Sequence, residues 1–143
     1  ESAAHSVQVG LSEKGIETQI MKRSSEDIPL NGSMAEEKNR IRSNAQTVET
    51  CALILYDTAN ALERTECGQD EARAALNGIL KVLKGLREDN AAAGTMYDAW
   101  NAELVRAERK GKEIASGILF AKDLRYLQVQ LCFSVLNMGQ CFS

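Results

Sequence analysis

The chain has 143 residues, enough for one domain; 44% of them are hydrophobic but only 5% are aromatic, which is typical of long, narrow helices. The net charge of -3, with basic residues interspersed among acids, argues against nucleic acid or anionic lipid as a partner. The sequence has no run of about 18 apolar residues and no export signal, so a membrane anchor would lie outside this segment.

The N-terminal segment alternates between apolar and polar residues. This period of two occurs in 7–11 and again in 16–20, on either side of the turn sequence 12–15, and it predicts a β-hairpin. An amphipathic helix is the alternative. In the polar loop that follows, Asn31 begins an N-glycosylation sequon. The next residues also resemble a cloning junction, which makes 1–31 a candidate for a grafted or companion segment, separate from the helical part at 34–143.

A first helix is expected from about residue 34 to residue 64. Ser33 and Glu36 have the spacing of a capping box, which satisfies free backbone amides at a helix start. Apolar residues then recur at alternating steps of four and three: Ile41, Ala45, Val48, Ala52, Leu55, Ala59 and Leu62. This phase breaks at Gly68, which we expect to end the helix in the left-handed conformation, with Asp70 capping the next helix.

A heptad seam then runs from Ala72 to Ala121, and it predicts one helix of about 75 Å over residues 70–122. A bend near Gly94 is the alternative, because residues 90–94 include poor helix formers. A seam this long predicts burial mostly against other chains, in a trimeric coiled coil. The expected interface residues are Leu76, Ile79, Leu83, Leu86, Asn90, Tyr97, Trp100, Leu104, Ile114 and Ile118.

The last segment fits two periods. Leu124, Leu127 and Leu131 have helical spacing, but residues 127–135 also alternate strictly and are rich in β-branched and aromatic types, which favours a strand. That strand would pair with the N-terminal hairpin. The expected fold is therefore mainly α: a coiled-coil core, a shorter preceding helix and a small antiparallel β element made by the chain ends.

The four cysteines, Cys51, Cys67, Cys132 and Cys141, lack C-x-x-C spacing and have one histidine beside them, so the sequence predicts no zinc site. An even number favours disulfides and an oxidising compartment. Cys51 and Cys67 would lie about 24 Å apart on a straight helix, too far to pair. They could instead pair with Cys132 and Cys141, or these two could form a C-terminal loop, leaving the first two free or bridged to a companion fragment.

Three polar residues, one in the seam and two at the positions that flank it, suggest a role in assembly. Asn90 occupies an a position, where a polar side chain sets register and oligomeric state, unless it is a solvated cap. Glu103 and Glu108 occupy g and e positions, which meet between neighbouring parallel helices. Sharing a proton would relieve their repulsion at acidic pH and make them pH sensors; solvated surface positions are the alternative. The chain has no catalytic triad and no phosphate loop, so we expect neither an enzyme nor a cofactor.

The order of hairpin, helix, Gly68 break, long seam and an end containing Cys132 and Cys141 resembles the stem of the membrane-fusion subunit of orthomyxovirus-type hemagglutinins and isavirus fusion proteins. The fusion peptide and anchor of that family are absent here, and the two closing cysteines are spaced differently from the influenza pattern. The resemblance implies a homotrimer on a viral envelope that refolds at endosomal pH and joins viral and host membranes through segments outside this chain.

A second hypothesis is a disulfide-linked helical surface antigen or adhesin of a parasite or bacterium, which acts by protein binding. Such a protein would fold as a monomeric hairpin or bundle. Oligomeric state separates the two hypotheses, because a parallel trimer favours the fusion core and a monomer favours the antigen.

Overall fold

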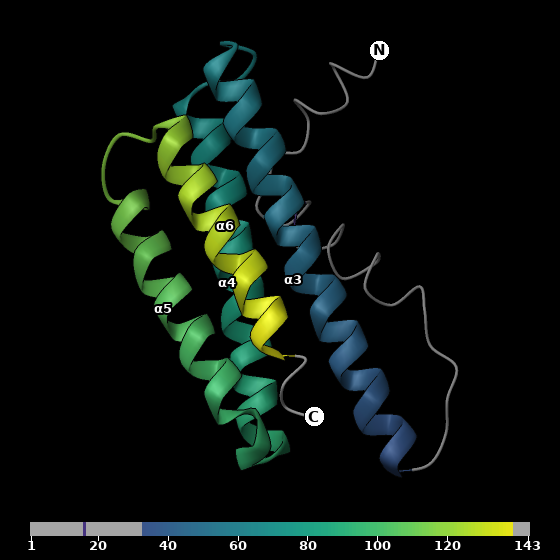
Figure 1. Ribbon diagram of the computed structural model, residues 1–143. Helices are drawn as coiled ribbons and strands as arrows, with labels where there is room; N and C mark the ends of the chain where they lie inside the picture. Colours follow the sequence, from purple (N-terminus) through teal and green to yellow (C-terminus); the bar gives the residue numbers. More distant parts are fainter. Residues whose placement is uncertain (1–15, 17–32, 139–143) are drawn as a thin grey trace.

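The computed structural model describes Ile16 and residues 33–138, and this part of the chain forms a bundle of four long helices (Figure 1). In chain order the elements are α3 (Ser33–Glu63), α4 (Gln69–Ala93), the short 3-10 helix η2 (Thr95–Tyr97), α5 (Asp98–Ala115) and α6 (Ala121–Met138). Consecutive helices are antiparallel. Both α3 and α5 pack against α4 and α6, and α6 lies along α3, so the bundle closes as a ring of four.

The first predicted helix is confirmed as α3, within one residue at each end. Its stripe faces the core: Val48, Ala52, Leu55 and Ala59 are buried. The ends of the stripe, Ile41 and Leu62 among them, are partly buried against the same core. An alternation of four and three steps identifies the inner side of this helix because such positions share one face.

The predicted break between the first two helices is also confirmed, but the residues act differently. Thr65, with φ 56°, takes the left-handed conformation, whereas Gly68 is extended with φ -101° and is the N-cap of α4. The Gly68 backbone N donates a hydrogen bond of 2.7 Å to the Glu71 carboxylate. The expectation that Gly68 is left-handed and that Asp70 caps the next helix is therefore wrong.

The prediction of one helix over 70–122 is wrong. The helix stops at Ala93, Gly94 has φ 138°, a conformation that few other residues adopt, and the chain reverses through η2 into α5. The apolar residues recur on both sides of this turn because each of the two antiparallel helices has its own apolar stripe. Periodicity alone does not tell a continuous helix from two helices that fold back on each other.

Because of this reversal, the seam is buried inside one chain. Eight of the nine apolar residues expected at a trimer interface are at most 8% exposed: Leu76, Ile79, Leu83, Leu86, Tyr97, Trp100, Leu104 and Ile114. Ile118 is the exception, at 68% exposure, since α5 ends at Ala115 and Ile118 lies in the turn before α6. Burial was predicted correctly for these eight residues, but they are buried by helices of the same chain and not by other chains.

The strand predicted over 127–135 is wrong, because these residues belong to α6. The helical alternative describes the segment: Leu124, Leu127 and Leu131 are fully buried and face the core. The described residues contain no strand with which a β element could pair. The hairpin predicted near the N-terminus lies outside them except for Ile16, which is helical and buried in the same core as the bundle. The division at residues 1–31 and 34–143 stays a prediction.

Polar contacts hold the α5–α6 turn against the start of α4. The Gln69 side chain makes two hydrogen bonds to Leu119, donating to its carbonyl and accepting from its backbone N, each 2.8 Å long. Arg73 donates to the carbonyls of Ala115 and Gly117. These bonds satisfy backbone groups at the end of α5 and fix where α6 begins.

Candidate functional site

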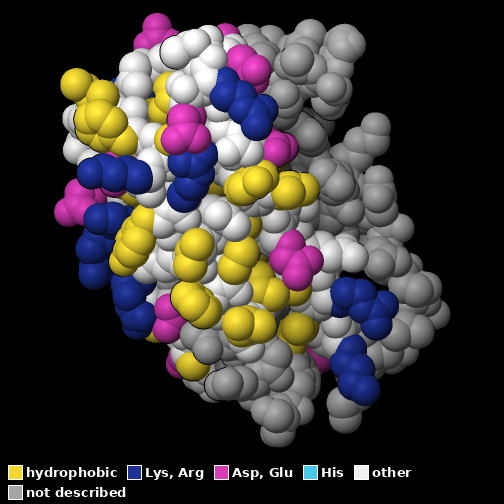
Figure 2. Space-filling model, turned by 45° about the horizontal axis from the view of Figure 1, so that its top comes forward, with side chains coloured by type: hydrophobic (Ala, Val, Ile, Leu, Met, Phe, Trp, Pro, Cys, Tyr) yellow, Lys and Arg dark blue, Asp and Glu magenta, His cyan; other side chains and the backbone are white. Residues whose placement is uncertain are grey.

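Among residues 33–138, six of the exposed large apolar side chains lie on α3 and α6, which are neighbours along their length. Figure 2 shows hydrophobic side chains gathered across the middle of one side of the molecule. We call this surface the α3–α6 face, and its six large side chains are 46% to 68% exposed. They are Leu53, Tyr56, Tyr126, Val129, Phe133 and Leu136.

The α3–α6 face exists because α6 is apolar on two sides. Its inner stripe, which includes Leu127 and Leu131, fills the core. A second stripe runs along its outer side at steps of three, four and three, from Tyr126 to Leu136. The prediction of a strand over 127–135 placed the apolar residues of both stripes on the same side of a sheet, so the outer stripe was not recognised. The helical spacing of Tyr126, Val129 and Phe133 was the signal that could have revealed the outer stripe.

Ion pairs and ring contacts hold the N-terminal end of α6 in place beside this face. The Arg125 guanidinium donates to Glu63 Oε1 at 2.6 Å and to Asn60 Oδ1 at 2.9 Å, and so ties α6 to the end of α3. The hydrogen bond and the charge of Arg125 lower the pKa of Glu63. Lys110 of α5 lies over the Tyr126 ring, 5.2 Å from its centroid. The register of α6 against both neighbours is therefore well defined.

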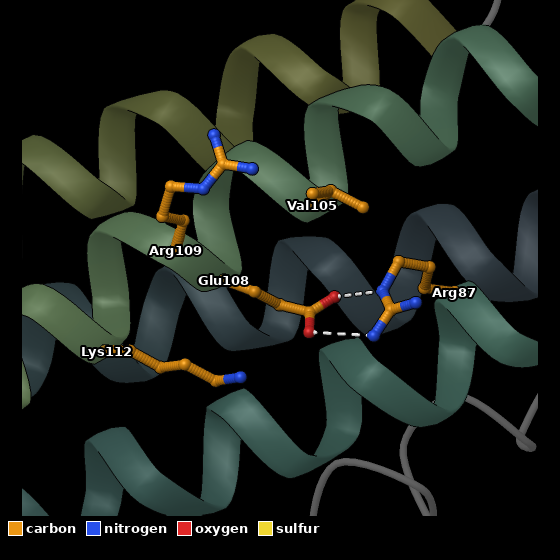
Figure 3. A pocket seen from close by; sticks show the side chains of 5 residues that line it. All are labelled: Arg87, Val105, Glu108, Arg109 and Lys112. Carbon is orange, nitrogen blue, oxygen red and sulfur yellow. Dashed lines mark hydrogen bonds and ion pairs between the residues drawn. The ribbon is translucent and has the colours of Figure 1, made fainter.

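A second candidate is a cleft of about 320 Å³ between α4 and α5, drawn in Figure 3. It is lined by Arg87, Val105, Glu108, Arg109 and Lys112. Arg87 and Glu108 point toward each other across it. The three basic side chains of this lining can attract an anionic group, and Glu108 is already paired with Arg87.

Each of the two predicted pH sensors forms an ion pair with an arginine of this chain. Glu108 is 5% exposed and forms a bidentate ion pair with Arg87, with distances of 2.6 and 3.2 Å. The hydrogen bond to Glu108 raises the pKa of Arg87. Glu103 forms an exposed ion pair with Arg106, 3.0 Å long. Stabilisation by acid stays a prediction for an assembled state.

Asn90 is fully buried and links three helices of the same chain. Its Oδ1 accepts a hydrogen bond from Asn44 Nδ2 at 3.0 Å, and its Nδ2 donates to Asn101 Oδ1 at 3.2 Å. Asn101 in turn donates to the Arg87 carbonyl. In the structure Asn90 therefore connects α3, α4 and α5 within one bundle, and its role in the register and oligomeric state of an assembly stays a prediction.

Cys51, Cys67 and Cys132 are free thiols that differ in accessibility. Cys51 is fully buried in α3, and this burial raises the pKa of its thiol to about 12. Burial also raises the pKa of Cys67, which is partly accessible, whereas Cys132 is exposed beside the outer stripe of α6. Cys141 and the glycosylation candidate Asn31 lie outside the described residues. A disulfide to a companion fragment stays a prediction.

Among Ile16 and residues 33–138, no three His, Cys, Asp or Glu side chains are placed to hold a metal ion. Within the same part of the chain, no helix combines the length and the hydropathy needed to cross a membrane. Comparison of the chain with protein-family models, curated proteins and solved structures finds no match. The arguments for function therefore come from the surface of the bundle itself.

Proposed function

We propose that this chain is a helical protein-binding domain that acts by docking a partner protein on the α3–α6 face. The observation that carries the proposal is the exposure of six large apolar side chains on two adjacent helices, between 46% and 68% each. Together they expose about 600 Å² of apolar surface. An apolar surface of this size is at the upper end of what monomeric proteins expose, and such surfaces often bind other proteins.

This proposal follows the second sequence hypothesis, a surface antigen or adhesin that acts by protein binding and not by catalysis. The burial of the heptad seam within one chain supports it, because all the apolar residues that a fusion-type trimer would use, except Ile118, are already buried in the core of the bundle. The extracellular location is part of the proposal. It rests on the sequence, namely the even number of cysteines and the sequon at Asn31.

The viral fusion hypothesis stays a prediction. A fusion trimer would require the turn at Gly94 to open and α4 and α5 to join into one helix, as fusion proteins of that kind do when they refold. The bundle would then be a conformation that precedes refolding. The antigen hypothesis is favoured because it requires no second conformation.

The proposal is tested with two variants matched in exposure and chemistry. Phe133→Glu places a charge in the α3–α6 face, whereas Ile118→Glu places the same charge on an equally apolar exposed residue of the α5–α6 turn. Each protein is immobilised at low density and exposed to a cell-surface protein extract, and the retained proteins are quantified by mass spectrometry. We expect at least one protein to be retained by the parent and by Ile118→Glu but reduced about tenfold or more by Phe133→Glu.

Loss of binding must be separated from loss of folding. Phe133 is 59% exposed, so the variant should keep the helical circular dichroism spectrum and the thermal midpoint of the parent within a few degrees. If no protein distinguishes the two variants, the α3–α6 face is not a docking surface for another protein and the proposed function fails.

A further inference from the structure

Building on the proposed protein-binding function, we infer that the α3–α6 face also takes a second copy of this chain, packed antiparallel so that α6 lies against α6. The available area is the first argument. The six side chains of the face provide about 600 Å², close to the roughly 800 Å² that each partner contributes to a standard interface. The exposed Cys132 borders the same surface and extends it.

The face is complementary to itself. Its outer stripe on α6 carries no charged residue between Tyr126 and Leu136, and it includes two aromatic side chains. A two-fold axis across the middle of the stripe, near Val129 and Phe133, would place Tyr126 of each copy against Leu136 of the other. Such an interface uses the same patch twice and closes with two chains, as most homodimers do.

The distribution of charge favours the antiparallel orientation. Lys122 is exposed at the N-terminal end of α6, and Lys110 lies over Tyr126 at the same end. Glu49 is exposed on α3. Asn60 contacts Arg125, and α3 and α6 run antiparallel from this contact. Glu49 is as many residues before Asn60 as Leu136 is after Arg125. Glu49 therefore lies at the level of Leu136, at the other end of the face.

A parallel pairing would therefore bring the lysines of the two copies together. The antiparallel pairing moves Lys122 of each copy toward Glu49 of the other, at the rim of the interface. Opposite charges at a rim contribute little energy, but they choose the orientation and speed association.

The first measurement is the mass of the parent chain by light scattering as a function of concentration at neutral pH. The expected result is a rise from 15.7 kDa toward twice that mass, with a dissociation constant in the micromolar range, about 10 µM. Phe133→Glu should weaken association about 100-fold because each interface contains this residue twice, whereas Ile118→Glu should associate like the parent.

Charge reversal tests the orientation. Lys122→Glu and Glu49→Lys should each weaken the dimer about twofold to fivefold, and the double variant should recover the affinity of the parent. A parallel dimer would show no such recovery, because the two residues would lie at opposite ends of the interface. That result would overturn the inferred arrangement.

A native thiol provides a measurement that needs no substitution. Cys132 is exposed beside the outer stripe, so dimerisation should cover it, while Cys67 lies in the turn between α3 and α4. The rate of maleimide labelling, read at each cysteine by peptide mass mapping, should fall at Cys132 as protein concentration rises and stay constant at Cys67. This measurement also works if Phe133→Glu fails to fold.

The outcomes separate this inference from the proposed function. A chain that stays at 15.7 kDa up to about 500 µM, with labelling at Cys132 independent of concentration, overturns the dimer. The proposed function still holds in that case if the extract experiment finds a partner that Phe133→Glu loses. If a dimer forms as expected but no other protein binds, self-association remains and docking of a different partner fails.

Discussion

At Gly111 the backbone of α5 approaches α4 so closely that a Cβ atom would lie 2.5 Å from Leu80 Cδ2. The packing of α5 against α4 is therefore close at this level. Gly85 in α4 is different, since a Cβ there would meet no atom within 4 Å. Two helical glycines in the same bundle therefore have opposite constraints.

This difference predicts opposite responses to alanine. Gly85→Ala should raise the free energy of unfolding by about 0.5 to 1 kcal/mol, because alanine favours the helix and restricts the unfolded chain. Gly111→Ala gains the same propensity but must displace the Leu80 side chain, so it should be at least about 1 kcal/mol less stable than Gly85→Ala. Urea denaturation followed by circular dichroism measures both values.

Equal effects of the two substitutions would contradict this account. They would mean that Leu80 takes another rotamer at no cost, and that the contact between α4 and α5 at this level is loose.

Glu108 shows how much of a residue's environment can be predicted from the sequence. Its position near the seam was identified from heptad lettering, and the structure does bury it. Its partner, Arg87, could not be predicted, because the pair forms only after the chain reverses at Gly94 and brings α4 beside α5. The same holds for Asn90, whose partners Asn44 and Asn101 come from two other helices.

At the level of elements, polar contacts hold the N-terminal end of α6 and the turn that precedes it. Its Arg125 binds Glu63 and Asn60 at the C-terminal end of α3, and the Gln69 contact to Leu119 fixes the preceding turn. Because α6 carries most of the α3–α6 face, these contacts determine how the face is presented.

The Glu63–Arg125 pair predicts a loss of stability in acid. Since the folded pKa of Glu63 is lowered below its unfolded value, the pair contributes its full stability above about pH 4.5 and loses it as pH falls through the lower folded pKa. The free energy of unfolding of the parent should therefore decrease more steeply below about pH 4.5 than that of Glu63→Gln. Denaturant titrations between pH 7 and pH 3 measure both slopes.

A double-mutant cycle provides the control. In an Arg125→Met background the partner charge is gone, so Glu63→Gln should no longer change the pH dependence. If the parent and Glu63→Gln keep parallel pH curves, the ion pair does not form in solution and the N-terminal end of α6 is held by its other contacts.

At the level of the whole molecule, the bundle and a fusion-type trimer use the same seam in two incompatible ways. In the bundle, Leu83, Trp100 and Leu104 are covered by helices of their own chain. In a trimer they would be covered by neighbouring copies. A measurement of mass therefore distinguishes the two more directly than any substitution.

We expect no trimer at pH 8 or at pH 5. Light scattering at both pH values should give masses between 15.7 kDa and twice that value, with the helix content unchanged. The physical reason is that opening the bundle would expose the whole buried seam to water before any trimer contact forms. A mass three times that of the chain at pH 5 would favour the fusion hypothesis and require the turn at Gly94 to open.

The sequence by itself determined that the middle of the chain is helical, where α3 lies, and which side of α3, α4 and α5 is buried. These are local properties, because residues three and four apart share a face whatever covers it. The chain ending at Met138 was ambiguous, since residues 127–135 fit periods of two and of 3.6, and only packing against α3 and α5 selected the helix.

Only the tertiary structure decided that the seam closes within one chain, that Glu108 pairs with Arg87, and that α6 presents a second apolar stripe to solvent. Each of these depends on the direction of the chain after Gly94 and after the turn at 116–120, where a few backbone angles place distant residues together. An apolar stripe indicates that one side of a helix is buried, but which helices bury it depends on the arrangement of the helices in space.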